Sequence, residues 1–321
     1  MREHGGDIDG AQCRHGGAPA DWIDLSTGIN RVSYPVPALP AEAWQALPTR
    51  AAMARLCAAA QAAYGTGWAV LPLAGAQAAI QMMPLPGPRG TAAILSPTYN
   101  EHAGAFTQAG WTLREDSSLE ALKGADCAVV VNPNNPDGRR HPPEALRDLA
   151  GHVGRLIVDE SFADVATELS LLPGPSRRGL FVMRSFGKFY GLAGLRLGFL
   201  LGDPAELEPF SAMAGPWPVS GLAIETACAA FADTGWAEAT RRRLADDAQR
   251  LDRLALARGW ATCGGCDLYR LYDVGDALAA QDHLARHRIW SRRFGYAPRW
   301  LRLGLPGSPA EWARLEQAMA A

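Results

Sequence analysis

Ser185-Phe-Gly-Lys188-Phe-Tyr-Gly-Leu-Ala-Gly-Leu-Arg196-Leu-Gly198 is the most informative stretch of this 321-residue chain. One lysine stands between a hydroxyl three residues before it and a guanidinium eight residues after it, in a turn of small residues that leads into an apolar strand. A lysine amine can condense with an aldehyde, while Ser185 and Arg196 can donate hydrogen bonds to a phosphate. The stretch therefore suits a cofactor that carries both an aldehyde and a phosphate. The alternative interpretation is an ordinary strand-turn-strand with a solvated lysine.

The same stretch resembles the lysine loop of the pyridoxal-phosphate-dependent aminotransferase superfamily (fold type I, class I/II). The resemblance implies that Lys188 is the catalytic lysine that bonds to pyridoxal 5'-phosphate, and that Ser185 and Arg196 bind the cofactor phosphate. It also implies an α/β fold: a large domain with a doubly wound, mostly parallel sheet and a smaller α+β C-terminal domain. Strands and helices alternate between residues 52 and 202, as such a sheet requires.

Two predicted strands upstream of the lysine end in polar side chains. Arg155-Leu-Ile-Val-Asp159-Glu ends in carboxylates, at the edge where parallel sheets place ligand-binding groups. A carboxylate there can keep a pyridine nitrogen protonated, so Asp159 is the candidate, with a capping or turn aspartate as the alternative. The second strand, 126–132, runs into a loop that two prolines and a glycine make rigid. In the family's NPxNPTG motif, Asn135 matches the asparagine that donates to the cofactor's phenolic oxygen, whereas Asp137 replaces the threonine.

Two more segments complete the expected cofactor site. The predicted strand 68–73 leads into Ala74-Gly75-Ala76-Gln77 and an alanine-rich helix, whose first backbone amides can bind an anion. The family binds the cofactor phosphate at this turn, so the resemblance implies the same role for Gly75, Ala76 and Gln77. Tyr99 follows the predicted strand 92–95, where the family stacks a catalytic aromatic ring on the pyridine. A buried structural tyrosine is the alternative, because stacking contributes only about 0.5–1.5 kcal/mol.

Arginines near the C-terminus are the candidate substrate ligands. Trp300-Leu-Arg302-Leu-Gly-Leu305 places an arginine on a mostly apolar strand, where it needs an anionic partner. In the family that partner is the substrate α-carboxylate, while a structural ion pair is the alternative for Arg302. The basic pair Arg292 and Arg293 precedes the same strand.

Two clusters are similar to the threonine-phosphate decarboxylases of cobalamin biosynthesis. One cluster is Cys13-Arg-His15-Gly16-Gly17 together with residues 24–30. The other is residues 215–220, at the expected hinge between the domains. The resemblance implies decarboxylation of L-threonine O-3-phosphate to (R)-1-aminopropan-2-yl phosphate. The substrate ligands expected from these arguments are His15, Gly16, Asn30, Asn135, Arg292 and Arg302. A disordered arm is the alternative for His15, and a histidinol-phosphate aminotransferase or a non-catalytic cofactor-binding partner protein are the alternatives for the whole chain.

Charge and composition exclude several other classes of protein. A formal charge of −2 argues against nucleic-acid binding, and no apolar run is long enough to span a bilayer. The polar N-terminus carries no apolar signal-peptide core, so we expect a cytoplasmic protein. Cys263-Gly-Gly-Cys266 stands alone without nearby histidines, so no metal is expected.

The expected organisation is an N-terminal arm (1–37) that packs with the small domain, a large cofactor-binding domain (38–210) and a small C-terminal domain (211–321). The proline-rich stretch from Pro204 to Pro218 marks the change of domain. Helices are predicted at 52–64, 76–83, 100–109, 143–152, 221–232 and 237–258 and after Pro309, and late strands at 268–272 and 300–305. The resemblance further implies a homodimer. Leu47 stands where many relatives carry a tyrosine that reaches the neighbouring subunit's cofactor.

Overall fold

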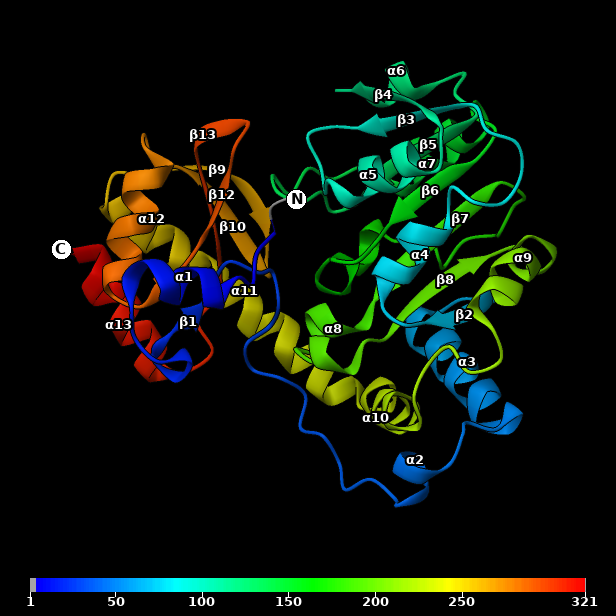
Figure 1. The fold of residues 1–321 in the computed structure, drawn as a ribbon, viewed down its shortest axis with the longest axis horizontal. Helices are drawn as coiled ribbons and strands as arrows, with labels where there is room; N and C mark the ends of the chain where they lie inside the picture. The colour runs from blue at the N-terminus through cyan, green and yellow to red at the C-terminus, as the bar shows by residue number, and fades with distance from the viewer. Residues whose placement is uncertain (1–3, 321) are drawn as a thin grey trace. The chain divides into compact units, whose positions relative to one another are not determined.

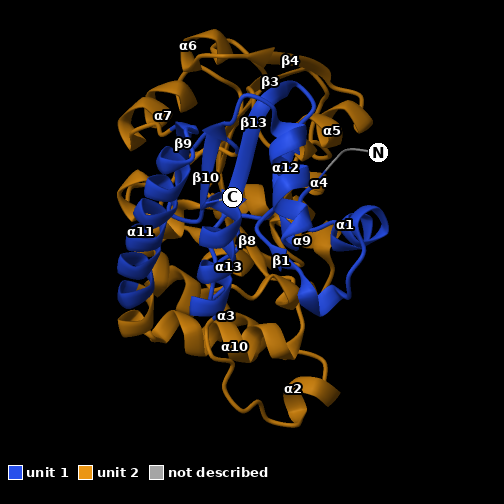
Figure 2. Ribbon diagram, turned by 90° about the vertical axis from the view of Figure 1, so that its left-hand side faces the viewer, with its two compact units in different colours: residues 1–33, 136–139, 238–321 blue, residues 34–135, 140–237 orange. Residues whose placement is uncertain are grey.

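The computed structural model describes residues 4–320 and divides them into two compact units (Figure 1). Unit 1 takes residues 4–33, 136–139 and 238–320, and unit 2 takes residues 34–135 and 140–237 (Figure 2). These limits differ from the expected limits of the large domain, 38 and 210. Residues 211–237 stay in unit 2 because α10 (Gly221–Ala232) packs along α3 (Arg50–Tyr64).

A seven-stranded sheet of order β2-β8-β7-β6-β5-β3-β4 forms the centre of unit 2. Its strands are β2 (Ala69–Leu73), β3 (Thr91–Leu95), β4 (Thr112–Asp116), β5 (Cys127–Val131), β6 (Leu156–Asp159), β7 (Leu180–Ser185) and β8 (Gly198–Gly202). The five strands from β4 to β7 in this order run parallel, and β8 is antiparallel to both of its neighbours. β5 and β6 are apolar and buried along almost their whole length, as covered parallel strands are. The expected α/β fold with a mostly parallel sheet is confirmed.

Most predicted helices of unit 2 begin within two residues of the expected position. The helices of this unit, besides α3 and α10, are α2 (Glu42–Gln45), α4 (Ala76–Met82), α5 (Glu101–Gln108), α6 (Leu119–Leu122), α7 (Pro143–Ala150), α8 (Phe186–Phe189) and α9 (Pro204–Ala214). Short 3-10 turns occur at Ala163–Val165, Thr167–Leu169 and Ala193–Leu195. The proline-rich segment expected to separate the domains begins α9 instead. Pro204 occupies the first helical turn, where its missing N–H costs nothing, and Asp203 caps the helix by accepting from the Ala205 N–H.

Unit 1 contains the N-terminal segment as well as the C-terminal part of the chain. Its antiparallel sheet has the order β12-β13-β10-β9, and β1 (Ile23–Asp24) pairs in parallel with β11 (Ile289–Trp290). The other elements are β9 (Ala261–Cys266), β10 (Tyr269–Asp273), β12 (Arg292–Phe294), β13 (Ala297–Gly304), α1 (Ile8–His15), a 3-10 turn at Pro19–Asp21, α12 (Ala277–Arg286), α13 (Pro309–Ala320) and the part of α11 (Thr234–Ala257) from residue 238 on. The Leu25 carbonyl also accepts a hydrogen bond from the Gly304 N–H. These backbone bonds tie the N-terminal segment to unit 1.

Across residues 4–320, every helix is too short or too polar to cross a membrane.

Candidate active site

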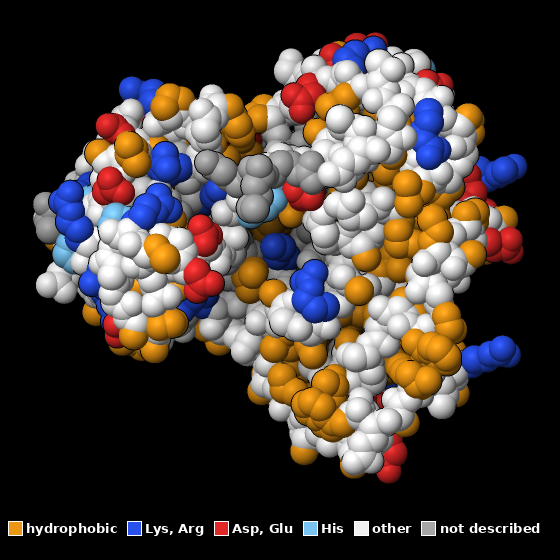
Figure 3. Space-filling model, viewed as in Figure 1, with side chains coloured by type: hydrophobic (Ala, Val, Ile, Leu, Met, Phe, Trp, Pro, Cys, Tyr) orange, Lys and Arg blue, Asp and Glu red, His pale blue; other side chains and the backbone are white. Residues whose placement is uncertain are grey.

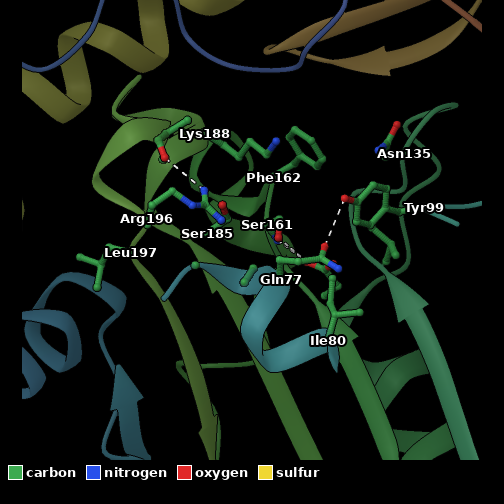
Figure 4. Close-up of a pocket in the computed structure, with 16 residues that line it drawn as sticks. Gln77, Ile80, Tyr99, Asn135, Ser161, Phe162, Ser185, Lys188, Arg196 and Leu197 are labelled. Atoms are coloured by element: carbon green, nitrogen blue, oxygen red, sulfur yellow. Dashed lines mark hydrogen bonds between the residues drawn. The ribbon is translucent and has the colours of Figure 1, made fainter. Parts of the chain in front are cut away.

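A cavity of about 170 Å³ lies in unit 2 at the carboxyl ends of the parallel strands (Figure 4). This is the edge at which open α/β sheets place ligands. The cavity is lined by all nine residues predicted to bind the cofactor: Gly75, Ala76, Gln77, Tyr99, Asn135, Asp159, Ser185, Lys188 and Arg196. We call it the unit 2 cavity. The structure therefore brings together side chains that are up to 121 positions apart in the sequence.

One end of the unit 2 cavity is a cradle of backbone and cationic groups. Gly75 precedes α4 with φ 83° and ψ 162°, a conformation that only glycine adopts readily. A Cβ at this position would lie 2.7 Å from the Arg196 guanidinium. Arg196 itself has φ 52°, and its Nη1 donates to the Ala193 carbonyl. With the Ser185 hydroxyl beside them, these groups can donate several hydrogen bonds to a phosphate.

Asp159 supplies a buried carboxylate at the end of β6. Its side chain accepts hydrogen bonds from the Ser161 N–H at 2.9 Å and from the Ser161 hydroxyl, and it lies 3.0 Å from Nε2 of His102. Burial opposes ionisation, but the hydrogen bonds and charge of His102 together with Ser161 outweigh it and lower the pKa of Asp159. Asp159 is thus an ionised acceptor suited to a pyridinium N–H. His102 was not predicted as a site residue; the available signal was a histidine in the first turn of the helix that follows Tyr99.

The side chains of Tyr99 and Asn135 lie across the unit 2 cavity from Lys188 (Figure 4). The Tyr99 hydroxyl donates to Oε1 of Gln77 at 3.3 Å, and Nε2 of Gln77 donates to Glu101 at 3.0 Å. Gln77 is therefore held in place by its neighbours. On the other side, the Lys188 ammonium lies 5.6 Å from the centre of the Phe162 ring, a cation–π distance. Phe162 lines the cavity although the sequence analysis did not predict it.

These residues fit pyridoxal phosphate, the cofactor expected from the sequence. The cradle at Gly75 and Arg196 suits the phosphate, and the ionised Asp159 suits the pyridine nitrogen. Asn135 offers an amide donor for the phenolic oxygen, and Lys188 offers the amine that bonds to the aldehyde.

A second cavity, of about 490 Å³, lies in unit 1 and is strongly basic. We call it the unit 1 cavity. It is lined by His4, Gly5, Gly6, Asp7, Arg14, Gln281, Trp290, Ser291, Arg292 and Arg293. Nη1 of Arg292 donates to the His4 carbonyl at 3.1 Å. Ser291 is buried, with 1 % of its surface exposed. Its hydroxyl has no hydrogen-bond partner among the residues that the structure describes. Three arginines and one aspartate around a buried hydroxyl suit an anionic group.

His15, Gly16 and Asn30, predicted to contact substrate, line neither of these two cavities. The His15 ring lies 6.3 Å from Trp22 and 6.2 Å from Trp290, and its Nε2 is 3.7 Å from Asp282. The structure thus uses the second His-Gly-Gly sequence to pack unit 1, while the first one, residues 4–6, lines the unit 1 cavity. The sequence carries both copies, and nothing in the motif itself separates them.

Two further predicted ligands have structural contacts within unit 1. The side-chain carbonyl of Asn30 accepts from Arg243 at 2.7 Å and from the Val32 N–H at 3.1 Å. The buried Arg302 donates to the Ser26 carbonyl at 2.6 Å and lies over the Tyr269 ring at 5.1 Å. Burial lowers the pKa of Arg302.

The cysteine pair gives no sign of metal binding. Cys263 is exposed whereas Cys266 is buried, and burial raises the pKa of Cys266 to about 11. Within residues 4–320, no group of three His, Cys, Asp or Glu side chains could hold a metal ion.

Comparison with known proteins identifies the family. The model of the family "Aminotransferase class I and II" matches residues 46–319. The threonine-phosphate decarboxylase of Pseudomonas aeruginosa is 45 % identical over 99 % of this chain and 97 % of its own, and that of a Sinorhizobium species is 39 % identical over the same shares. The crystal structure of histidinol-phosphate aminotransferase from Sinorhizobium meliloti in complex with pyridoxal-5'-phosphate is similar with a TM-score of 0.81, covering 97 % of this chain and 92 % of its own at 21 % identity. The chain therefore belongs to the class I and II aminotransferase family.

Proposed function

We propose that this protein is a pyridoxal-phosphate-dependent lyase that decarboxylates L-threonine O-3-phosphate to (R)-1-aminopropan-2-yl phosphate, a step of cobalamin biosynthesis. The observation that carries the proposal is the 45 % identity, over nearly both full lengths, to a threonine-phosphate decarboxylase. The set of residues around the unit 2 cavity supports the cofactor. Histidinol-phosphate aminotransferase remains the second candidate, because a protein of that name shares the fold.

Three residues of the chain have separate roles in this reaction. When bound, pyridoxal phosphate supplies a sink for the electron pair left on the α-carbon as carbon dioxide departs. Asp159 keeps the pyridine nitrogen protonated. Lys188 holds the proton that takes the place of the lost carboxylate, and Arg302 binds that carboxylate in the incoming substrate.

The position of the substrate phosphate separates decarboxylation from amino transfer. The bond that breaks must stand perpendicular to the cofactor ring, so a second anchor has to turn the carboxylate into that position. We propose Arg292 as a ligand of this phosphate, together with His4, which lines the same unit 1 cavity. Its surplus of arginines and the buried Ser291 hydroxyl support an anionic occupant.

Product analysis tests the reaction. The purified protein is incubated with threonine phosphate, and separately with histidinol phosphate and 2-oxoglutarate. We expect carbon dioxide and an aminopropanol phosphate from the first mixture. Glutamate from the second mixture would favour the aminotransferase instead, and no product from either would favour a non-catalytic partner protein.

Two histidines provide a matched test of the phosphate site. Arg292→Ala and His4→Ala should raise KM for threonine phosphate by a factor of about 10 or more, since a hydrogen bond to a charged group contributes about 1.5–3 kcal/mol. KM for unphosphorylated threonine should change little. His15→Ala, which removes a side chain packed between tryptophans, serves as the control. A larger effect of His15→Ala than of His4→Ala would return the phosphate role to the second His-Gly-Gly sequence.

The proposal includes a homodimer and a cytoplasmic location. Unit 2 exposes large apolar side chains on and around α2 and α10: Val36, Trp44, Leu47, Met213 and Trp217. Apolar side chains gather over these helices in the lower part of the surface view (Figure 3). A gathering of exposed apolar side chains favours a protein partner, and a second copy of the chain is the partner that the family resemblance implies.

A further inference from the structure

Arg184 is a buried arginine with no part in the chemistry described so far. It is 2 % exposed, and it stands on β7 directly before Ser185. Its Nη1 donates to Glu160 at 3.0 Å, and its Nη2 donates to Asp164 at 2.6 Å. The guanidinium carbon also lies 4.4 Å from the centre of the Tyr64 ring. These residues form a buried charged cluster behind the unit 2 cavity.

Glu160 joins this cluster to a second loop. The residue is 0 % exposed, and its carboxylate also accepts from the Ser170 hydroxyl at 2.6 Å and from the Leu171 N–H at 2.7 Å. Burying three charges is costly, and such clusters can often be replaced by neutral residues without loss of stability. Stability alone is therefore a poor reason for this cluster.

The position of the cluster in the sequence suggests a better reason. Glu160 lies between Asp159 and Ser161, which line the unit 2 cavity, and Asp164 follows two residues after Phe162, which also lines it. β6 and β7 are neighbouring parallel strands, and the Glu160 N–H donates to the Met183 carbonyl at 2.9 Å. Arg184 thus ties the segment that carries Asp159 and Phe162 to the strand that carries Ser185 and leads to Lys188.

We infer that Arg184, Glu160 and Asp164 are positioning residues for the cofactor site. They fix the distance between the Asp159 carboxylate and the Lys188 amine, which lie on adjacent strand ends and must contact opposite parts of one ring. The inference rests on the proposed cofactor but not on the identity of the substrate.

A neutral replacement of the whole cluster separates positioning from stability. In the triple variant Arg184→Met, Glu160→Gln, Asp164→Asn no charge is left unpaired, so we expect a thermal midpoint close to that of the wild type. We expect the cofactor dissociation constant to rise about tenfold, or about 1.4 kcal/mol, because Asp159 and Lys188 would no longer be held in the arrangement that one ring requires. The pH midpoint of the visible absorbance of the Lys188-bound cofactor should shift as well. Both readouts need no substrate, so they stand even if the proposed reaction is wrong.

Two further variants complete the experiment. Arg184→Lys keeps the charge but not the two-pronged geometry, and it should shift the same two readouts in the same direction. Arg155→Met is the control. Arg155 lies before β6, at the opposite end from Asp159; it donates to the carbonyls of Met83 and Pro86 and lies over the Phe181 ring. It should change thermal stability only. Unchanged cofactor affinity and pH midpoint in a folded triple variant, or in Arg184→Lys if the triple variant does not fold, would overturn the inference.

Discussion

Lys188 stands in α8, directly after β7, and it is one of only two lysines in the chain. The other, Lys123, is bonded on the surface to Glu120. Borohydride reduction of the yellow holoprotein should therefore fix the cofactor to Lys188. Lys188→Ala should abolish this attachment, while Lys123→Ala should leave it intact. Peptide mapping checks the site, and a label on Lys123 or on the N-terminal amine would contradict the assignment.

Asp159 is expected to control turnover more than cofactor binding. Asp159→Asn removes the charge that keeps the pyridine nitrogen protonated, but it leaves the phosphate cradle at Gly75 and Arg196 intact. We expect a fall in kcat of several orders of magnitude, with cofactor affinity changed by less than about tenfold. The exposed Asp148→Asn is the control. Near-normal turnover in Asp159→Asn would mean that another group holds the ring nitrogen.

The lowered pKa of Asp159 also determines how the stability of the folded protein changes with pH. A carboxylate whose folded pKa lies below the unfolded value, about 3.9, stabilises the protein above that value, and this contribution is lost as pH falls through the folded pKa. Asp159 should therefore stay ionised at neutral and mildly acidic pH. His102→Gln removes part of the cause of the shift, so its acid unfolding midpoint should move to higher pH.

Short motifs predicted nine of the residues that line the unit 2 cavity, because these residues lie in the short turns and loops that follow or precede predicted strands. They do not distinguish two equal sequences that take different places in the fold. His-Gly-Gly occurs at residues 4–6 and at 15–17. Only the folded chain shows that His4 lies beside Arg292 while His15 lies between two tryptophans. His102 and Phe162 were missed for the same reason: their roles depend on contacts with Asp159 and Lys188 in three dimensions.

Among the elements, Gly75 before α4 and Gly215 after α9 form a matched pair of glycines. Gly75 and Gly215 have similar backbone angles, φ 83° and ψ 162° against φ 74° and ψ −176°. A Cβ at Gly75 would lie 2.7 Å from Arg196, whereas a Cβ at Gly215 would meet nothing within 4 Å. Both alanine variants carry the backbone strain, about 1–3 kcal/mol. Only Gly75→Ala should also weaken cofactor binding, measured by fluorescence titration. Equal affinity losses in the two variants would show that the cradle does not depend on this contact.

Helix limits were predicted best where the hydrophobic pattern of the sequence and a capping residue indicate the same first residue. α10 was predicted with its observed limits, since Ser220 caps it by accepting from the Ala223 N–H. No helix is predicted at α9, where the proline-rich stretch is expected to mark a change of domain. In the structure Pro204 falls in a first turn and Pro209 is accommodated within the helix. Unit 2 ends at residue 237 and not at the expected 210. The reason is that α10 packs on α3, a long-range contact that cannot be read from the local sequence.

On the scale of the whole molecule, the apolar face around α2 and α10 provides a test of assembly. Trp44 is 69 % exposed and Leu47 is 62 % exposed, values that are unfavourable for an isolated chain in water. If a second copy covers them, Trp44→Ser with Leu47→Asp should weaken the dimer by a factor of about 10 or more, because a few central apolar residues carry most of the energy of an interface. Leu256→Asp is the control, since Leu256 lies on α11 in unit 1 and is 74 % exposed. Sedimentation velocity over a concentration series measures the effect.

The control should sediment as the wild type does. A wild-type protein that is monomeric and fully active at micromolar concentration would rule out the dimer as the working form.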